Sequence, residues 1–280
     1  MTICSHCSCE NSLMSEKCSQ CGMFLGFPNV NDCSQREEME ALKERYLEKL
    51  KLAELEEQRK KRIDFEEQVE KSLAVINVKL DYLYNLVTGK STIYSTYQLQ
   101  TDGEIRDFVR SEFDKERRGI EGTLFGSYGS NIRYAALSLD GSGLKSYGDY
   151  TIILSDESVR LRTTLLEENS YNFIRRHKIL AGDKIPKGYR AVWKERHKLA
   201  IAKLMEKILL TKDMNYAIII LNSTGDRKHD EFIEVHIYGK INKEAIHAVR
   251  GNSKVNIGQK EKILRIKEYL KINKKKWIEE

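Results

Sequence analysis

Apolar residues recur at spacings of three and four along a stretch from Arg36 to about Lys90 that contains no proline and no glycine before Gly89. The members of this seam are Val69, Leu73, Ile76, Leu80, Leu83 and Val87. Such spacing is typical of a coiled-coil helix, although the polar run 56–62 interrupts the pattern upstream. The pattern predicts a helical stalk over residues 35–90. Two interpretations stay open: a parallel coiled coil that forms a homodimer, or a helix that packs on the C-terminal part of its own chain.

After Gly89 the hydrophobic pattern changes to short β-rich runs that alternate with helical ones. Helices are expected at 104–121, 189–210 and 260–276, the last of them basic. Strands are expected at Tyr134–Leu139, Asp149–Leu154, Met214–Leu221 and Glu231–Tyr238. A long loop joins the last two strands, so we expect them to be antiparallel. The pattern predicts an α+β protein with a C-terminal mixed α/β domain over residues 91–280.

Two CxxC pairs near the N-terminus, ten residues apart, supply Cys4, Cys7, Cys18 and Cys21. Each pair can form a turn that grips one face of a tetrahedral zinc ion, and Gly22 offers the permissive backbone that such a turn often needs. Four sulfur ligands leave no position for water, so the metal is expected to be structural. His6, Cys9 or Cys33 could replace a ligand, but the regular pairing favours the four cysteines. The spacing predicts a zinc ribbon over residues 1–34 that recognises a target.

Composition narrows the class of protein. The chain has 280 residues, of which 40% are hydrophobic and 32% charged, and its net charge of +6 is too small to argue for nucleic-acid binding by itself. The N-terminus has no secretory pattern, and the longest apolar run, Ala217–Leu221, is too short to span a bilayer. All six cysteines lie within the first 33 residues. These features predict a cytoplasmic protein with no membrane partner.

Two groups of polar residues are candidates for a site. Strand alternation puts Phe232, Glu234, His236 and Tyr238 on one face of the last strand, opposite the aliphatic Ile233, Val235 and Ile237. A carboxylate and an imidazole on one face suit a cleft, although a solvent-facing strand would look the same. The second group comprises Tyr147, Arg160, Arg162, Thr163, Asn169, Ser170 and Tyr171. It could bind the phosphates and ribose hydroxyls of a nucleotide, or form a solvated connection.

The order YAALSL, YGDYTIIL, R-x-R-T-T followed by N-S-Y, and finally EVHIYG resembles bacterial ADP-ribosyltransferase-like domains, a superfamily of NAD-using toxins and effectors. The resemblance covers roughly Gly122 to Arg250. It implies a split sheet and a catalytic Glu234 that stabilises an oxocarbenium-like transition state as nicotinamide leaves NAD. In many members a second acidic or amide residue stands two positions before this glutamate. Here Glu231 stands three positions before it, which alternation places on the opposite face.

The resemblance also assigns roles to the other candidates. His236 would orient a ribose hydroxyl, Arg160 or Arg162 would hold the pyrophosphate, and Tyr147 or Tyr171 would pack against nicotinamide. Thr163, Asn169 and Ser170 would complete the NAD site. The Ser-Thr-Ser strand of one branch is absent, and Tyr134–Leu137 stands near its place.

The leading hypothesis is a toxin or antiviral defence effector that transfers ADP-ribose from NAD to a macromolecular target selected with the help of the zinc ribbon. One rival is a nuclease or phosphodiesterase that binds a divalent metal through Asp149, Glu234 and His236. The other is a non-enzymatic zinc-ribbon protein that binds nucleic acid. Convergence of the three metal-binding side chains would distinguish the nuclease.

Overall fold

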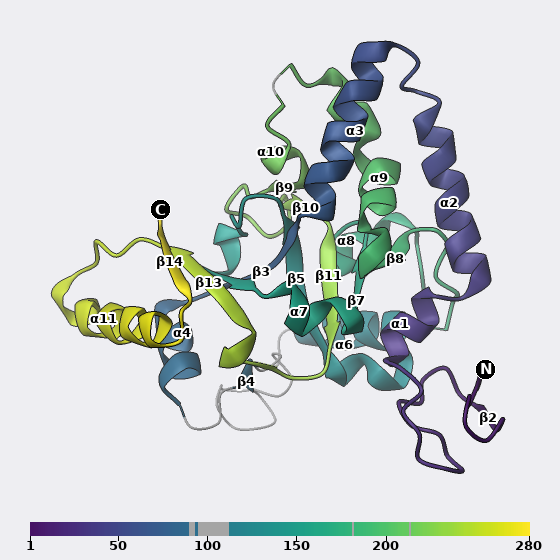
Figure 1. The fold of residues 1–280 in the computed structure, drawn as a ribbon, viewed down its shortest axis with the longest axis horizontal. Coiled ribbons are helices and arrows are strands. Elements are labelled where there is room, and N and C mark those ends of the chain that lie inside the picture. The colour runs from purple at the N-terminus through teal and green to yellow at the C-terminus, as the bar shows by residue number, and fades with distance from the viewer. Residues whose placement is uncertain (90–92, 95–111, 181, 213) are drawn as a thin grey trace.

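The structure is a computed structural model that describes residues 1–89, 93–94, 112–180, 182–212 and 214–280. It is a mixed α+β fold built on one large sheet (Figure 1). No helix in the described ranges is both long and apolar enough to cross a bilayer.

The central sheet has eight strands in the order β14-β13-β6-β3-β5-β11-β7-β8. Only the β13–β14 pair is parallel, and the other pairs are antiparallel. The strands are β3 (Leu73–Val78), β5 (Ile132–Ser138), β6 (Tyr150–Leu154), β7 (Thr163–Leu166), β8 (Arg190–Val192), β11 (Glu234–Tyr238), β13 (Ile246–Gly251) and β14 (Lys276–Glu279). Strand β11 lies inside the sheet, between β5 and β7, and all five of its residues are buried.

Helices cover the sheet in two groups (Figure 1). The helices α2 (Arg36–Leu50), α3 (Glu56–Glu70) and α9 (Arg196–Leu210) pack together, and α4 (Leu80–Thr88) packs against α11 (Ile257–Ile272) beside β14. The remaining helices are α1 (Pro28–Cys33), α6 (Glu112–Phe125), α7 (Asp156–Val159), α8 (Ser170–Arg176) and α10 (Ala217–Ile220). Three two-stranded pairs complete the described elements: β1 (Thr2–Ile3) with β2 (Glu10–Asn11), β9 (Leu221–Asn222) with β10 (Glu231–Phe232), and β4 (Ile93–Tyr94) with β12 (Ile241–Asn242).

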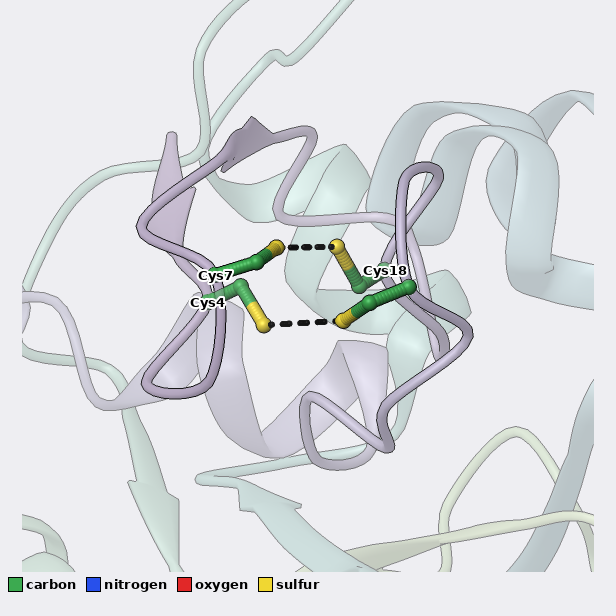
Figure 2. A group of neighbouring side chains, drawn as sticks. Cys4, Cys7 and Cys18 are labelled. Atoms are coloured by element: carbon green, nitrogen blue, oxygen red, sulfur yellow. Dashed lines mark hydrogen bonds between the residues drawn. The ribbon is translucent and has the colours of Figure 1, made fainter.

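The N-terminal 25 residues lie at one corner of the molecule, where four cysteines face one another (Figures 1 and 2). Helix α1 follows and packs on β7, β8 and β11. The predicted ribbon therefore leads directly into the main body, and α1 belongs to that body.

The prediction of one helix over residues 35–90 is wrong, because the chain forms α2, α3, β3 and α4 there. The apparent heptad seam combines the end of α3, two residues of β3 that are three positions apart and therefore lie on opposite faces of the strand, and one face of α4. Each segment points its apolar residues into the protein's own core, and Val69, Ile76 and Leu83 are all buried. These side chains are used inside one chain, so they offer no seam to a partner helix.

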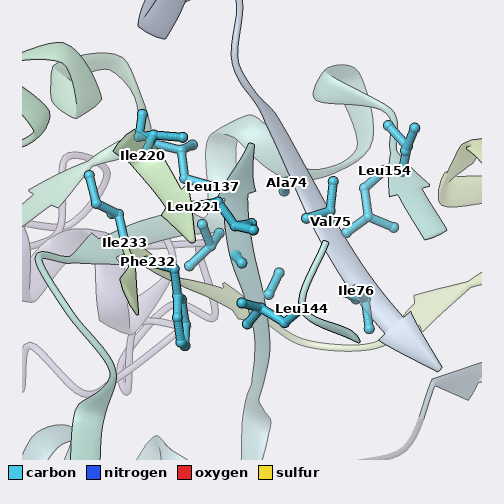
Figure 3. Packing of buried hydrophobic residues seen from close by; sticks show 14 of the residues in the cluster. Ala74, Val75, Ile76, Leu137, Leu144, Leu154, Ile220, Leu221, Phe232 and Ile233 are labelled. Atoms are coloured by element: carbon cyan, nitrogen blue, oxygen red, sulfur yellow. The ribbon is translucent and has the colours of Figure 1, made fainter. Parts of the chain in front are cut away.

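The core explains why the segment 35–90 is not a separate stalk. Leu42 of α2 and Phe65 of α3 belong to the same hydrophobic cluster as the strands of the central sheet. Figure 3 shows Val75 of β3 among buried residues of other strands, including Leu137 of β5. Because β3 pairs with both β5 and β6, removing the segment would remove a central strand.

Other expected elements shift in the structure. Residues 189–210 contain β8, a short 3₁₀ turn and α9, and residues 257–272 form the basic helix that precedes β14. The run expected as a strand at Met214–Leu221 forms α10 and the two-residue β9, because one turn of helix buries Ile220 while leaving Ile218 exposed. The antiparallel pair expected at the end of this loop is confirmed, since Leu221 pairs with Phe232. Residues 104–111 of the expected helix at 104–121 lie outside the described residues.

Candidate functional site

The four cysteines of the CxxC pairs form one cluster (Figure 2). The Sγ atoms of Cys4 and Cys21 are 3.6 Å apart, those of Cys7 and Cys18 are 3.5 Å apart, and all four lie within 4.8 Å of one another. A disulfide would need about 2 Å, whereas sulfurs about 2.3 Å from a tetrahedral zinc ion would be separated by about 3.8 Å. The thiols are free and have the spacing of a metal site, so the cluster can bind a metal such as zinc.

Local hydrogen bonds hold the two cysteine turns in place. The N–H groups of Ser8 and Gly22 donate to the carbonyls of Cys4 and Cys18, and Gly22 has a φ of 73°, a conformation that glycine adopts without strain. The buried side chain of Asn11 bridges the turns: its Nδ2 donates to the carbonyl of Cys9, and its Oδ1 accepts the N–H of Ser19 at 2.8 Å. The ligand positions are therefore organised by the protein itself.

The metal-free thiols have divergent pKa values. The N–H of Cys21 is the main cause that lowers the pKa of Cys18 to about 6. For Cys7 the N–H of Cys9 also acts to lower the pKa, but burial and the adjacent sulfurs of Cys21 and Cys18 outweigh it, and the pKa rises to about 12. Within the cluster, the thiol of Cys18 therefore loses its proton more readily than the thiol of Cys7. A divalent cation would displace the remaining protons.

Cys9 and Cys33 lie outside this cluster, as expected. The thiol of Cys9 contacts the carbonyl of Glu10. Cys33 is buried in α1, where burial raises its pKa to about 12. It therefore behaves as a small core residue.

The second candidate site is on β11, where Glu234 and His236 point to the same side. His236 Nε2 lies 3.0 Å from Glu234 Oε2, and the His236 ring is in edge contact with the rings of Phe125 and Tyr134. Glu234 and His236 are themselves buried, with 5% and 2% of their surface exposed, so the interpretation of β11 as a plain solvent-facing strand is wrong. The predicted alternation holds only from Glu234 onward, because the chain leaves strand geometry at Ile233.

The upstream residue Phe232 accordingly joins the main core together with Ile233, Val235 and Ile237. It does not share the face of Glu234. The break between β10 and β11 therefore removes one of the two aromatic residues that alternation had placed beside the carboxylate.

Ser170, the first residue of α8, fixes the Glu234 carboxylate. Its N–H donates to Oε2 at 2.9 Å, and its hydroxyl donates a short hydrogen bond to the same oxygen. With His236, three groups hold Oε2. The other oxygen, Oε1, accepts no hydrogen bond from any described residue, and the side chain is 7% exposed. The site presents one anchored carboxylate oxygen and one that has no hydrogen-bond partner among the described residues.

Asn29 ties the N-terminal segment to this site. Its Nδ2 donates to the carbonyl of Arg162 at 3.0 Å, to the hydroxyl of Thr164 at 3.3 Å and to the carbonyl of His236 at 3.2 Å. The residue is buried in α1, directly after the cysteine segment. Sequence reasoning missed it, because no local pattern marks an asparagine whose partners lie more than 130 positions away.

The candidate NAD-binding residues divide into two groups. Asn169, Ser170 and Tyr171 open α8 beside Glu234. The Oδ1 of Asn169 accepts the N–H of Tyr171 at 3.0 Å as the helix cap, and the Tyr171 hydroxyl accepts a hydrogen bond from Arg175. Ser170 is the member of the group that contacts the glutamate directly.

The other candidates have different surroundings. Arg162 donates to the carbonyls of Tyr238 and Lys240, and the hydroxyl of Thr163 donates to the carbonyl of Val159. Both side chains thus satisfy backbone groups. Arg160 is exposed near Asp156.

Tyr147 packs beneath the Arg227 guanidinium and against the main core. It does not belong to the second cluster of core residues, which surrounds the Glu234 side of β11 and includes Leu166, Phe173 and Tyr238.

Asp149 does not join Glu234 and His236. It is exposed and lines a separate cavity of about 440 Å³ with Asn77 and Arg250. Within the described ranges, the groups close enough to share a metal ion are the four cysteines and a set formed by Glu167, Glu168 and His177. The convergence that the nuclease hypothesis requires is therefore not present.

The set of Glu167, Glu168 and His177 is already neutralised by arginines. Arg45 lies 2.8 Å from Glu167, and Arg176 pairs with both carboxylates. Burial is the main cause that raises the pKa of Glu168 and lowers that of His177. This arrangement needs no metal ion to balance its charge.

Compared with models of known protein families the sequence matches none, and a search of curated proteins finds no significant relative.

Proposed function

We propose that this protein is an ADP-ribosyltransferase-like enzyme whose reaction centre is Glu234. In this reaction the bond between nicotinamide and ribose breaks, and positive charge develops on the ribose. An acceptor group on a macromolecule then forms a bond to the ribose carbon that nicotinamide has left. A carboxylate that is already in position opposes that charge without reorganising. The observation that carries the proposal is that Oε2 of this side chain is anchored by three groups while Oε1 has no hydrogen-bond partner among the described residues.

His236 and Ser170 act in the proposal as positioning residues. Contacts with a backbone N–H, a hydroxyl and an imidazole fix the direction of the carboxylate. The segment Asn169–Tyr171 is the side on which NAD would lie, since it opens α8 next to Glu234. In this proposal Arg162 mainly anchors the chain, because its Nε and Nη1 donate to backbone carbonyls.

We further propose that the cysteine cluster holds a structural zinc ion and that the ribbon around it contacts the target. Four sulfurs fill a tetrahedral site, which excludes a water ligand. Several apolar side chains of the ribbon are exposed, namely Ile3, Met14, Met23 and Phe24. Exposed apolar groups on so small a unit favour a binding surface. The proposal includes a cytoplasmic setting, where free thiols remain available to a metal.

The test is incubation of the full chain with NAD labelled in the adenosine part, together with a cell extract. The proposal expects release of free nicotinamide and transfer of label to a protein or nucleic-acid fraction. A folded preparation that releases no nicotinamide and labels neither fraction would refute it.

A further inference from the structure

Nearly all of the excess positive charge is at the C-terminal end. Residues 254–280 contain nine lysines and arginines and four glutamates, a net charge of +5, whereas the whole chain carries +6. The remaining 253 residues are therefore almost neutral. A charge difference this large between parts of one chain points to a polyanionic partner for the basic part.

Helix α11 presents this charge on its outer side. Its inner side, with Ile263, Ile266 and Leu270, is buried and packs toward α4, at the edge of the molecule (Figure 1). The outer stripe follows spacings of three and four and consists of Ile257, Lys260, Leu264, Lys267 and Lys271. The helix thus projects lysines away from the fold, together with the exposed side chains of Ile257 and Leu264.

Many of these lysines have no counter-charge. Lys262 pairs with Asp81, and Lys267 pairs with Glu279. In contrast, five exposed lysines have no carboxylate within 4.0 Å among the described residues: Lys254, Lys260, Lys271, Lys274 and Lys276. Unpaired ammonium groups keep their full charge for a partner.

We propose that the outer side of α11 and the turn after it bind the phosphate backbone of a nucleic acid. Lys260 and Lys271 are separated by about 16 Å along the helix axis, roughly the rise of five successive phosphates on one strand of a duplex. An anionic membrane is the rival partner that the experiment must separate from a nucleic acid, because Ile257 and Leu264 are exposed on the same stripe as the lysines. The surface is independent of the reaction proposed for Glu234.

The experiment measures binding of the full chain to a fluorescently labelled DNA duplex of about 20 base pairs as a function of salt. The variant Lys260→Gln/Lys271→Gln/Lys274→Gln removes three of the unpaired lysines. The slope of log K against log salt is negative, and each lost phosphate contact makes it less steep by about 0.9. The magnitude of the slope should therefore decrease by roughly 2 to 3 in the triple variant. The matched control replaces three exposed lysines elsewhere by glutamine, namely Lys43, Lys51 and Lys71, and should keep the slope of the wild type.

Three results would overturn the proposal. The first is no binding of the duplex by the wild type. The second is an unchanged slope in the triple variant. The third is binding of phosphatidylserine vesicles by a protein that does not bind the duplex, which would identify a lipid surface as the partner.

Discussion

Replacing Arg190 by methionine should destabilise the whole protein. Arg190 on β8 lies 2.5 Å from Asp32 of α1 and 3.1 Å from Glu38 of α2, and its side chain is 11% exposed. Burial alone would lower the pKa of this guanidinium, but the adjacent thiol of Cys33 and the two carboxylates raise it above its ordinary value. The arginine therefore joins the first two helices to the edge of the sheet through a buried ionic network.

The magnitude follows from what the substitution leaves behind. Removing one partner of a buried pair costs about 3 to 5 kcal/mol, because the other charge stays buried. Glu38 keeps one hydrogen bond at 3.0 Å from the N–H of Gly188, so we expect the lower end, about 3 kcal/mol. For a chain of this size each kcal/mol shifts the melting temperature by about 2 to 4 °C, so the Tm should fall by roughly 6 to 12 °C.

Urea unfolding and calorimetry of the full chain measure this effect. The double variant Arg190→Met/Glu38→Gln should recover part of the loss, because it removes the unpaired charge. Lys207→Met is the surface control: it breaks an exposed pair with Glu231 and should cost less than about 1 kcal/mol. A loss below about 1 kcal/mol for Arg190→Met would refute the integration of α1 and α2 into the main body.

Two further perturbations test the metal site and a buried lysine. Cys18→Ser should abolish the binding of one metal ion per chain and unfold the ribbon. In calorimetry the main melting transition should stay within a few degrees of its wild-type temperature, because α1 is held by the sheet. If removal of the metal melts the whole protein in one step, this expectation is wrong. Burial lowers the pKa of Lys203 to about 8, against the attraction of Glu167 and Glu168. The unfolded chain binds this proton up to about pH 10.5, so the free energy of unfolding should rise between pH 8 and 10.5, by at most about 3 kcal/mol. In Lys203→Met the free energy of unfolding should not rise over this pH range. If it rises equally in the variant and the wild type, titration of groups other than Lys203 causes the rise.

The features that sequence predicted well are local ones. The four metal-binding cysteines follow from spacing, because two residues between cysteines are enough to turn both thiols toward one ion. The shared side of Glu234 and His236 follows from their separation by two positions on a strand. In both cases neighbouring residues determine the geometry.

The features that could not be predicted from the sequence depend on tertiary contacts. The run Leu73–Val78 fits a heptad and a strand equally well, and pairing with β5 and β6 decides for the strand. The hydrogen bonds from Ser170 to Glu234 join residues 64 positions apart, and no local pattern predicts them. Asn29 gives no signal, since its three acceptors lie more than 130 positions away, one in a 3₁₀ turn and two on strands.

The central claim is tested most directly by the rate of nicotinamide release in two matched variants. Glu234→Gln keeps the shape of the side chain, and its amide oxygen can still accept the hydrogen bonds from Ser170, so folding should be preserved. Loss of the charge should slow release by about a hundredfold to a thousandfold, equivalent to about 3 to 4 kcal/mol. Glu231→Gln changes an exposed carboxylate paired with Lys207 and should leave the rate unchanged. If Glu234→Gln releases nicotinamide as fast as the wild type, or if Glu231→Gln carries the loss, Glu234 is not the reaction centre.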